Sequence, residues 1–296
     1  MARPKDTPPL ASLEEAITVL FCLIDDAYRL LNPSADGYAS LKRLSDSEVL
    51  TLVLLQQLRS VESERSFLRD VARFFSHLFP GASGLHPSSL NRRARKLRRF
   101  LEPLRRAVLA ELAGEPETLL VDSTLLSVLH PRQVAQSAGF EGAAWAVWGS
   151  FAVYGMKLHL LCSTNRVPLS YELSAANTAD VLLVRELLAA ADLEEGGVAR
   201  RLLGDLAYRS AKLGDDLADV GVLLATERAD RRPRVRQQIE VCFASLKRVF
   251  GVGETSAATL VGLVTRIAAK VTAYTYGLYL NRLLGRPQGH IKGLWA

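Results

Sequence analysis

The stretch "TLLVDSTLLSVL", residues 118–129, is where the sequence changes from helix-like to sheet-like patterns. It is a short apolar run bounded by turn residues, as is typical of a buried strand. Asp122 interrupts the run, and an unpaired carboxylate in an apolar strand is energetically costly. The sequence leaves two explanations open: the carboxylate is hydrogen-bonded to a turn at the strand's end or edge, or it belongs to a functional site.

Further strands and helices follow this run. "FAVYGMKLHLLCS" and "VPLSYELS" alternate in the manner of paired strands, and "TNR" between them indicates a hairpin turn. The later segments are predicted, in order, as helix, strand, helix, strand, helix and helix: 180–191, 200–207, 210–220, 221–227, 234–250 and 257–284. This order predicts a mixed α/β sheet with flanking helices, in which the first three strands are antiparallel.

Residues 12–113, before the sheet, are predicted to be wholly helical. "LSDSEVLTLVLLQQL" opens with Ser45 and Glu48 at the spacing of a capping box, followed by an apolar run. The pattern changes after "AGEPE", which places the domain boundary near Gly114 to Glu117. We therefore expect an all-α domain over 1–115 and an α/β domain over 116–296.

Composition narrows the class of protein. The 296 residues are 49% hydrophobic, enough for one large or two moderate domains, and the net charge of +6 favours a polyanionic partner. The three cysteines lie apart in apolar stretches, which predicts buried reduced thiols, and the five histidines lack zinc-like spacing. The N-terminal residues lack a signal peptide's apolar core, and no apolar run approaches the ~20 residues of a membrane helix. We expect a cytoplasmic protein without a membrane partner.

Two more acidic residues join Asp122 as candidates for chemistry. Asp205, in "RRLLGDLAYRS", ends a predicted strand where ligands of α/β sheets gather, although it could equally cap the helix that follows. In "RQQIEVCFASLKRVFG", Arg236, Glu240 and Lys247 form a narrow stripe beside a broad apolar face. The alternative is a surface pair worth about 0.2–0.5 kcal/mol. Three carboxylates suit two Mg²⁺ ions, which prefer oxygen ligands and can promote phosphodiester cleavage.

Other polar and aromatic residues are interpreted structurally. Asp180 precedes an apolar helix and is interpreted as its cap. Lys157 and His159 share one face of a strand without an assigned role. "EGAAWAVWGSF" is interpreted as a connection between strands, with Trp145 and Trp148 placed against the sheet or, alternatively, stacked on an unpaired base.

Four stretches together resemble a known family: "LLVDSTLLSV", "VYGMKLHLLCSTNRVPLSYELSAANTADV", "LLGDLAYRS" and "RQQIEVCFASLKRVFG", over most of residues 118–255. They resemble the DDE transposases of bacterial insertion sequences, nearest to the insertion-sequence-982 type within the insertion-sequence-4-like group. The resemblance implies a ribonuclease-H-like catalytic domain, with Asp122, Asp205 and Glu240 as its catalytic and metal-binding residues. It also implies two Mg²⁺ ions as cofactors, for which Mn²⁺ can substitute.

The resemblance extends to the cations around the glutamate. Many relatives carry Tyr, Arg, Glu and Lys separated by two, three and six residues. Arg236, Glu240 and Lys247 match this spacing, whereas Pro233 stands at the tyrosine position. By resemblance, Arg236 and Lys247 are expected to bind DNA phosphates near the metal ions.

Two basic clusters predict DNA contact. In a helix expected over 90–108, the side opposite the apolar residues carries Arg92, Arg95, Lys96, Arg98, Arg99, Arg105 and Arg106. With the preceding helix and turn, it suits a helix-turn-helix-like domain, although a charge run can also be a solvated face. The second cluster precedes the glutamate helix and suits either a phosphate-tracking loop or a solvated one: Arg228, Arg231, Arg232, Arg234 and Arg236.

These patterns and the resemblance predict a metal-dependent transposase. It would cleave DNA at the ends of an insertion element and join the freed 3′-hydroxyl to target DNA. Its partners would be double-stranded DNA, as terminal inverted repeats and target, and the resemblance implies a homodimer or larger assembly. Two alternatives remain open: a ribonuclease-H-like nuclease without strand transfer, and a domesticated DNA-binding regulator with an idle active site.

Overall fold

The computed structural model describes residues 12–33, 41–134, 139–193, 200–226 and 234–295. The chain forms two compact units, one of residues 1–112 together with 265–296, and one of residues 113–264. The predicted division fell near residue 115 and kept the C-terminal residues with the sheet. In the structure, residues 265–296 instead pack with the N-terminal helices.

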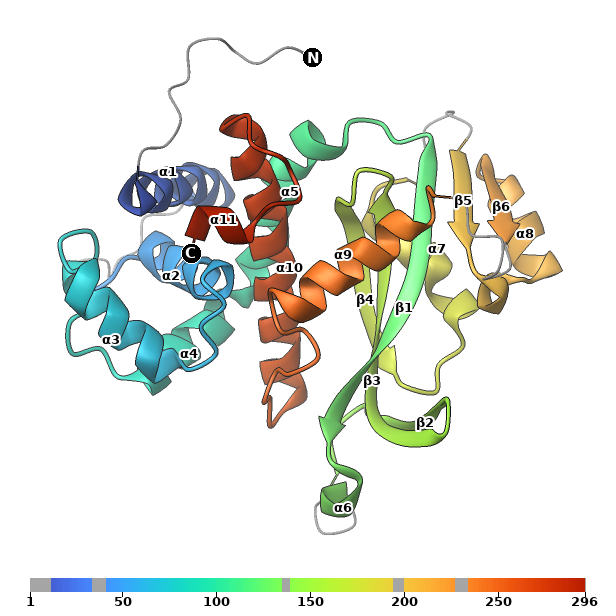
Figure 1. Ribbon diagram of the computed structural model, residues 1–296, viewed down its shortest axis with the longest axis horizontal. Helices are drawn as coiled ribbons and strands as arrows, with labels where there is room; N and C mark the ends of the chain where they lie inside the picture. The colour runs from blue at the N-terminus through green and yellow to red at the C-terminus, as the bar shows by residue number, and fades with distance from the viewer. Residues whose placement is uncertain (1–11, 34–40, 135–138, 194–199, 227–233, 296) are drawn as a thin grey trace. The chain divides into compact units, whose positions relative to one another are not determined.

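The first unit is all-helical in its described part (Figure 1). Its elements are α1 (Leu13–Leu31), α2 (Asp46–Leu58), α3 (Glu64–Phe74), α4 (Pro87–Leu97), α5 (Leu101–Ala113), most of α10 (Leu260–Leu283) and α11 (Lys292–Trp295), with 3₁₀ turns η2 (Pro80–Ala82) and η3 (Arg98–Phe100). The predicted capping box is confirmed, because Ser45 Oγ accepts from Glu48 N at 3.1 Å and Glu48 Oε2 accepts from Ser45 N at 2.5 Å. The helix predicted over 90–108 is divided by η3 into α4 and α5.

Helix α10 explains why the C-terminal residues belong to this unit. Buried residues lie all around it, including Val271, Tyr274 and Leu280, so the helix needs cover on every side. Thr272 and Tyr276 donate from their hydroxyls to the carbonyls of residues 101 and 104 in α5, both at 3.2 Å. A helix this apolar serves as the core of the helical unit.

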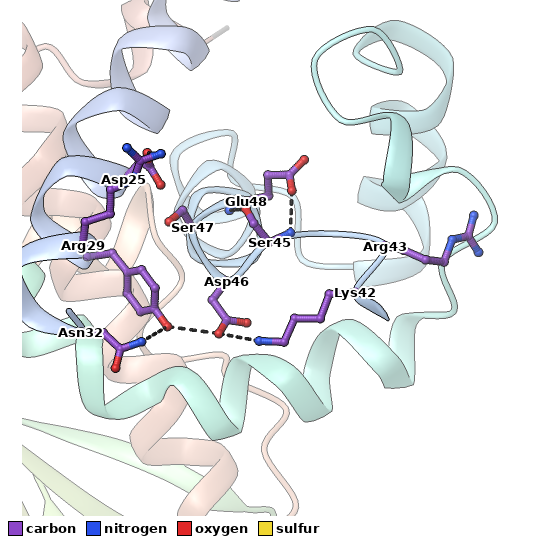
Figure 2. Close-up of a pocket in the computed structure, with 10 residues that line it drawn as sticks. Asp25, Arg29, Asn32, Lys42, Arg43, Ser45, Asp46, Ser47 and Glu48 are labelled. Atoms are coloured by element: carbon purple, nitrogen blue, oxygen red, sulfur yellow. Dashed lines mark hydrogen bonds and ion pairs between the residues drawn. The ribbon is translucent and has the colours of Figure 1, made fainter. Parts of the chain in front are cut away.

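A polar pocket of about 400 Å³ lies beside the start of α2, lined by residues of α1 and of the segment that enters α2 (Figure 2). Its centre is Asp46, which accepts hydrogen bonds from Tyr28 at 3.1 Å, Lys42 at 2.8 Å and Arg93 at 2.5 Å. Burial alone would raise the pKa of Asp46, but these three donors together lower it. Through these hydrogen bonds, Asp46 of α2 is joined to Tyr28 of α1 and to Arg93 of α4.

The second unit is built on a mixed sheet. Among its described residues, six strands form that sheet: β1 (Thr118–Leu129), β2 (Ala144–Trp148), β3 (Phe151–Ser163), β4 (Pro168–Ala175), β5 (Arg200–Gly204) and β6 (Val222–Thr226). The order is β2-β3-β1-β5-β6, with β4 also paired to β3. Strand β3 is antiparallel to β1, β2 and β4, whereas β5 is parallel to both β1 and β6. The predicted mixed sheet with antiparallel leading strands is confirmed.

Strand β2 was not predicted, because its sequence lacks the alternation of apolar and polar residues that signals a strand. The alternation is missing because apolar residues of this strand face solvent. Val147, for example, is apolar but 77% exposed. Trp145 lies 46% exposed, with its ring centroid 5.3 Å from that of Tyr154 in β3.

Helices cover both faces of the sheet (Figure 1). The helices of this unit are α7 (Val184–Ala190), α8 (Ala211–Ala218), α9 (Gln237–Arg248) and the short α6 (Pro131–Val134), which lies beyond the end of β1. Its 3₁₀ turns are η4 (Asp180–Leu183) and η5 (Leu206–Tyr208). On one face, Cys242 of α9 meets Cys162 of β3. On the other, Ser170 of β4 donates to the carbonyl of Leu187 in α7 at 2.6 Å. This is the predicted ribonuclease-H-like arrangement, preceded in the chain by helices.

The structure also tests the prediction of buried, reduced cysteines and the prediction that no helix spans a membrane. All three cysteines are free, and Cys22 is exposed rather than buried, which corrects its prediction. In the described part of the chain, no helix has the length and apolar character needed to cross a membrane.

Candidate active site

Asp122 and Asp205 stand where two parallel strands separate. The pairing of β1 with β5 ends at Leu120 and Leu203, while Asp122, two residues further, still pairs with Leu160 of β3. Asp205 follows the last residue of β5 directly. Asp122 thus lies just past the parallel pairing of β1 with β5, and Asp205 lies at the carboxyl end of β5, the usual place of ligand sites in α/β sheets.

The carboxyl group of Asp122 lies in a strongly perturbed environment. Its pKa is raised to about 6, chiefly by burial and also by the nearby charges of Asp205 and Glu240, whereas the backbone N–H of Ser123 and the guanidinium of Arg236 act to lower it. That N–H donates to Asp122 Oδ1 at 2.8 Å. Because all three acids influence one titration, the structure brings the predicted carboxylates into one electrostatic neighbourhood.

Asp205 has a local structural role as well. Its Oδ1 accepts from Ala207 N at 2.9 Å and caps the 3₁₀ turn η5, whereas the helix that follows, α8, is capped by Ser210. Tyr208, at the end of η5, is buried, and burial followed by the charges of Asp180, Asp122 and Asp205 raises the pKa of its phenol. The cap turns the chain so that Tyr208 packs beside the acids.

Helix α9 presents Glu240 in its first turn, where the helix dipole favours a carboxylate. Arg236 immediately precedes the helix, and its Nη2 lies 3.5 Å from Glu240 Oε1. The Arg236 side chain is 3% exposed and that of Glu240 36%. A pair with a buried guanidinium is not the exposed i,i+4 surface pair that the sequence left as an alternative.

Arg236 and Lys247 are less exposed than residues that bind DNA phosphates at the surface. Nε and Nη1 of Arg236 are buried and have no hydrogen-bond partner among the described residues. Burial lowers the pKa of Lys247, while the nearby Asp122 raises it. Both cations therefore stand next to the acids, with Arg236 inside the protein and Lys247 partly buried.

The donor set fits a divalent cation with a preference for oxygen. All three donors are carboxylates, which repel one another. A bound divalent cation would relieve that repulsion. Within the described ranges, no group of three or more His, Cys, Asp or Glu side chains is gathered closely enough to hold a metal ion. The three acids therefore influence one another electrostatically but are not gathered into a preformed metal site. Repulsion between their carboxylates favours this separation when no cation is bound.

The predicted DNA-binding cations fall into three groups. Those of α4 and η3 are all exposed: Arg92, Arg95, Lys96, Arg98 and Arg99. Arg105 is instead fully buried and paired with Glu102 through Nε at 2.8 Å and Nη2 at 2.5 Å, so its placement on the basic side was wrong. A third group of predicted cations lies outside the described residues: Arg228, Arg231 and Arg232. Pro233, at the tyrosine position of the resemblance, also lies outside them.

Comparison with known proteins identifies the family. Residues 113–276, more than half of the chain, match the family described as the transposase DDE domain. The chain belongs to this family. No curated protein matches it.

Two solved transposases are similar to this DDE transposase domain protein. A piggyBac transposase synaptic complex with hairpin DNA has a TM-score of 0.47 at 10% identity, over 94% of this chain and 78% of that one. The Mos1 mariner paired end complex with Mn has a TM-score of 0.30 at 11% identity, over 90% of this chain and 97% of that one.

Sequence reasoning missed a polar group beside the acids of this DDE domain. Asp180 was interpreted as a helix cap, but it makes no cap bond and is itself the first residue of η4. Its Oδ1 instead accepts from Ser123 Oγ at 2.7 Å and lies 3.1 Å from Lys157 Nζ. The only available signal was the pair Lys157 and His159 on one strand face, which does not identify a partner distant in the chain.

Proposed function

We propose that the protein is a transposase that cleaves phosphodiester bonds at the ends of a mobile element and joins the 3′-hydroxyl to target DNA. The observation that supports this most is that Asp205 and Glu240, from the end of β5 and from α9, both raise the pKa of Asp122 in β1 of a DDE domain. Three mutually repelling carboxylates have little value for stability, and such perturbed groups concentrate at functional sites.

Each residue has a stated part in this proposal. Asp122, Asp205 and Glu240 would hold two Mg²⁺ ions, or Mn²⁺ in their place. Such ions supply Lewis acidity and charge neutralisation to phosphodiester chemistry. Arg236 offsets the charge of Glu240 and Asp122 from inside the protein, so it acts on the site rather than on solvent-exposed DNA. Lys247, close to Asp122, would contact a phosphate oxygen of the bound DNA.

The helical unit would bind the element's ends. Arg92, Arg95, Lys96 and Arg99 follow the spacing i, i+3, i+4, i+7, so they share one side of the helical segment formed by α4 and η3, and all four are exposed. The inward side of α4 is occupied by Arg93, which donates to the carbonyl of residue 44 at 2.8 Å. The exposed cations fit the phosphates of double-stranded DNA. Two element ends require two active sites, so we propose a homodimer or larger assembly on DNA.

A cleavage assay tests the proposal. A plasmid that carries the gene's flanking inverted repeats is incubated with the full chain and Mg²⁺, and the wild type is compared with Asp205→Ala. We expect cleavage by the wild type only, with a loss of at least about a hundredfold in the variant. Equal cutting by both proteins would refute the assigned site.

A second assay separates transposition from simple hydrolysis. Donor duplexes with pre-cut 3′-hydroxyl ends are offered together with a target plasmid. Joined products support the transposase, whereas cleavage without joining would favour a ribonuclease-H-like nuclease. Binding without either activity would favour a DNA-binding regulator.

A further inference from the structure

A second polar cluster lies on the face of the sheet opposite to Asp122. Successive residues of a strand point to opposite faces, so Asp122 faces α9 while Ser123 faces the other way. In the register of the sheet, Ser123 pairs with His159 of β3, and Lys157, two residues before His159, shares that face. Asp180 of η4 completes this cluster, because it contacts all three side chains.

The contacts of Asp180 form a continuous network. Its Oδ1 accepts from Ser123 Oγ at 2.7 Å and lies 3.1 Å from Lys157 Nζ and 3.5 Å from His159 Nδ1. Lys157 also donates to the carbonyl of Thr178 at 2.7 Å, and the other ring nitrogen of His159 lies 2.8 Å from the hydroxyl of residue 174. The side chains of Asp180 and Lys157 are 15% and 14% exposed, so this is a network of partly buried, interacting polar groups.

The network reaches the active site through one residue. Ser123 uses its side chain to donate to Asp180 and its backbone N–H to donate to Asp122 Oδ1 at 2.8 Å. The rotation of the peptide between Asp122 and Ser123 therefore depends on a partner on the far face of the sheet. A carboxylate under repulsion from Asp205 and Glu240 needs such an anchor to keep one orientation.

We propose that Asp180 and Ser123 are positioning residues that hold Asp122 in the orientation needed to bind a divalent cation. Lys157, whose Nζ lies 3.1 Å from Asp180 Oδ1, holds Asp180 in place. This inference rests on the proposed function of Asp122, but it concerns residues outside the set of three acids. Partners that orient metal ligands from behind commonly affect metal affinity by about 10–100-fold.

The test measures Mn²⁺ binding to the full chain by calorimetry, together with the Mn²⁺ concentration that gives half-maximal DNA cleavage. Ser123→Ala removes the hydroxyl but keeps the backbone N–H, Ser123→Thr restores a hydroxyl, and Ser127→Ala is the matched control. Ser127 lies on the same face of β1, but its hydroxyl contacts only a carbonyl of its own strand among the described residues.

We expect Ser123→Ala to weaken Mn²⁺ binding about tenfold and to raise the required Mn²⁺ concentration by a similar factor, while Ser123→Thr and Ser127→Ala resemble the wild type. If Ser123→Ala binds Mn²⁺ as Ser127→Ala does, the positioning role is refuted. Should Ser123→Ala fail to fold, Asp180→Asn, of the same size, decides: weaker Mn²⁺ binding supports the proposal and unchanged binding overturns it.

One comparison separates this inference from the proposed function. Asp122→Asn and Asp205→Asn are titrated with Mn²⁺ in parallel. If neither weakens binding, the metal site itself is wrong. If both weaken binding but Ser123→Ala and Asp180→Asn do not, only the positioning role falls.

Discussion

The basic side chains of α4 and η3 and the one that precedes α9 are all cations, but they lie in two different environments. Arg92, Arg95, Lys96 and Arg99 are exposed to solvent, whereas the Arg236 side chain is 3% exposed and stands against Glu240. Exposed charges act at long range, independently and in a salt-dependent way. A buried charge is coupled to its neighbours, and its removal leaves them uncompensated. The difference shows that a basic residue near a DNA-processing site need not be a DNA contact.

The largest effect is expected from Asp122→Asn, which tests the buried side of this comparison. DNA cleavage should fall at least about a hundredfold. The metal-free protein should nevertheless gain about 1–3 kcal/mol at pH 8, because the folded state raises the Asp122 pKa to about 6 and so opposes its charge. The measurement is thermal unfolding in EDTA.

This gain has a defined pH dependence and a control. It should become complete as the pH rises past 6 and vanish as the pH falls below the unfolded value of 3.8, where Asp122 is protonated in both states. Asp215→Asn, on the exposed side of α8, should change neither stability nor cleavage. A destabilised or fully active Asp122→Asn protein would contradict the assignment.

Arg236→Gln should lower the stability of the metal-free protein by about 1–3 kcal/mol, because it leaves Asp122 and the partly exposed Glu240 without their buried cation. Mn²⁺ should restore part of this loss. The matched control is Arg234→Gln, which removes an exposed arginine two residues earlier. If Arg236→Gln leaves stability unchanged and lowers the salt dependence of DNA binding instead, then Arg236 is a phosphate contact like the cations of α4.

His159 is a second buried basic group, and its burial makes the stability of the protein depend on pH. Burial lowers its pKa to about 4, with Asp180 raising it and Lys157 lowering it. A depressed histidine pKa contributes stability above pH 6.5 that is lost as the pH falls to about 4, at most about 3 kcal/mol. The stability advantage of the wild type over His159→Gln should shrink across this window.

Two features of the measurement isolate this effect. Asp122 changes stability with the opposite sign between pH 4 and 6, so the difference between matched proteins is the useful quantity. The control His130→Gln removes an exposed histidine of the same unit and should show a constant difference. A constant difference for His159→Gln would mean that its imidazole is not held neutral.

The smallest effects on stability are expected on α4. Alanine at Arg92, Arg95, Lys96 and Arg99 together should shift stability by less than about 0.5 kcal/mol per site. The slope of log K for DNA against log salt should flatten by about 0.9 for each phosphate that the variant no longer neutralises. Lys212→Ala, an exposed cation on α8, should leave the slope unchanged. An unchanged slope in the α4 variant would show that this side of α4 does not face DNA.

Local patterns predicted most of the sheet unit but not its details. The strand with Asp122 and the helix with Glu240 were predictable, because apolar runs and helical spacing depend on neighbouring residues. Strand β2 was missed since both its composition and its exposure are unusual for a strand. The polar cluster around Asp180 was missed because its members lie up to 57 residues apart, as with Ser123 and Asp180, and no spacing rule connects them.

The sequence by itself determined the elements, the capping box at Ser45 and the candidate acids, since each rests on contacts within a few residues along the chain. Only the tertiary structure decided which charges are buried. It placed Arg236 and Arg105 inside the protein, left the α4 cations in water, and set Asp180 behind Asp122. The physical reason is that burial depends on what packs over a side chain, and that cover comes from segments distant in the sequence.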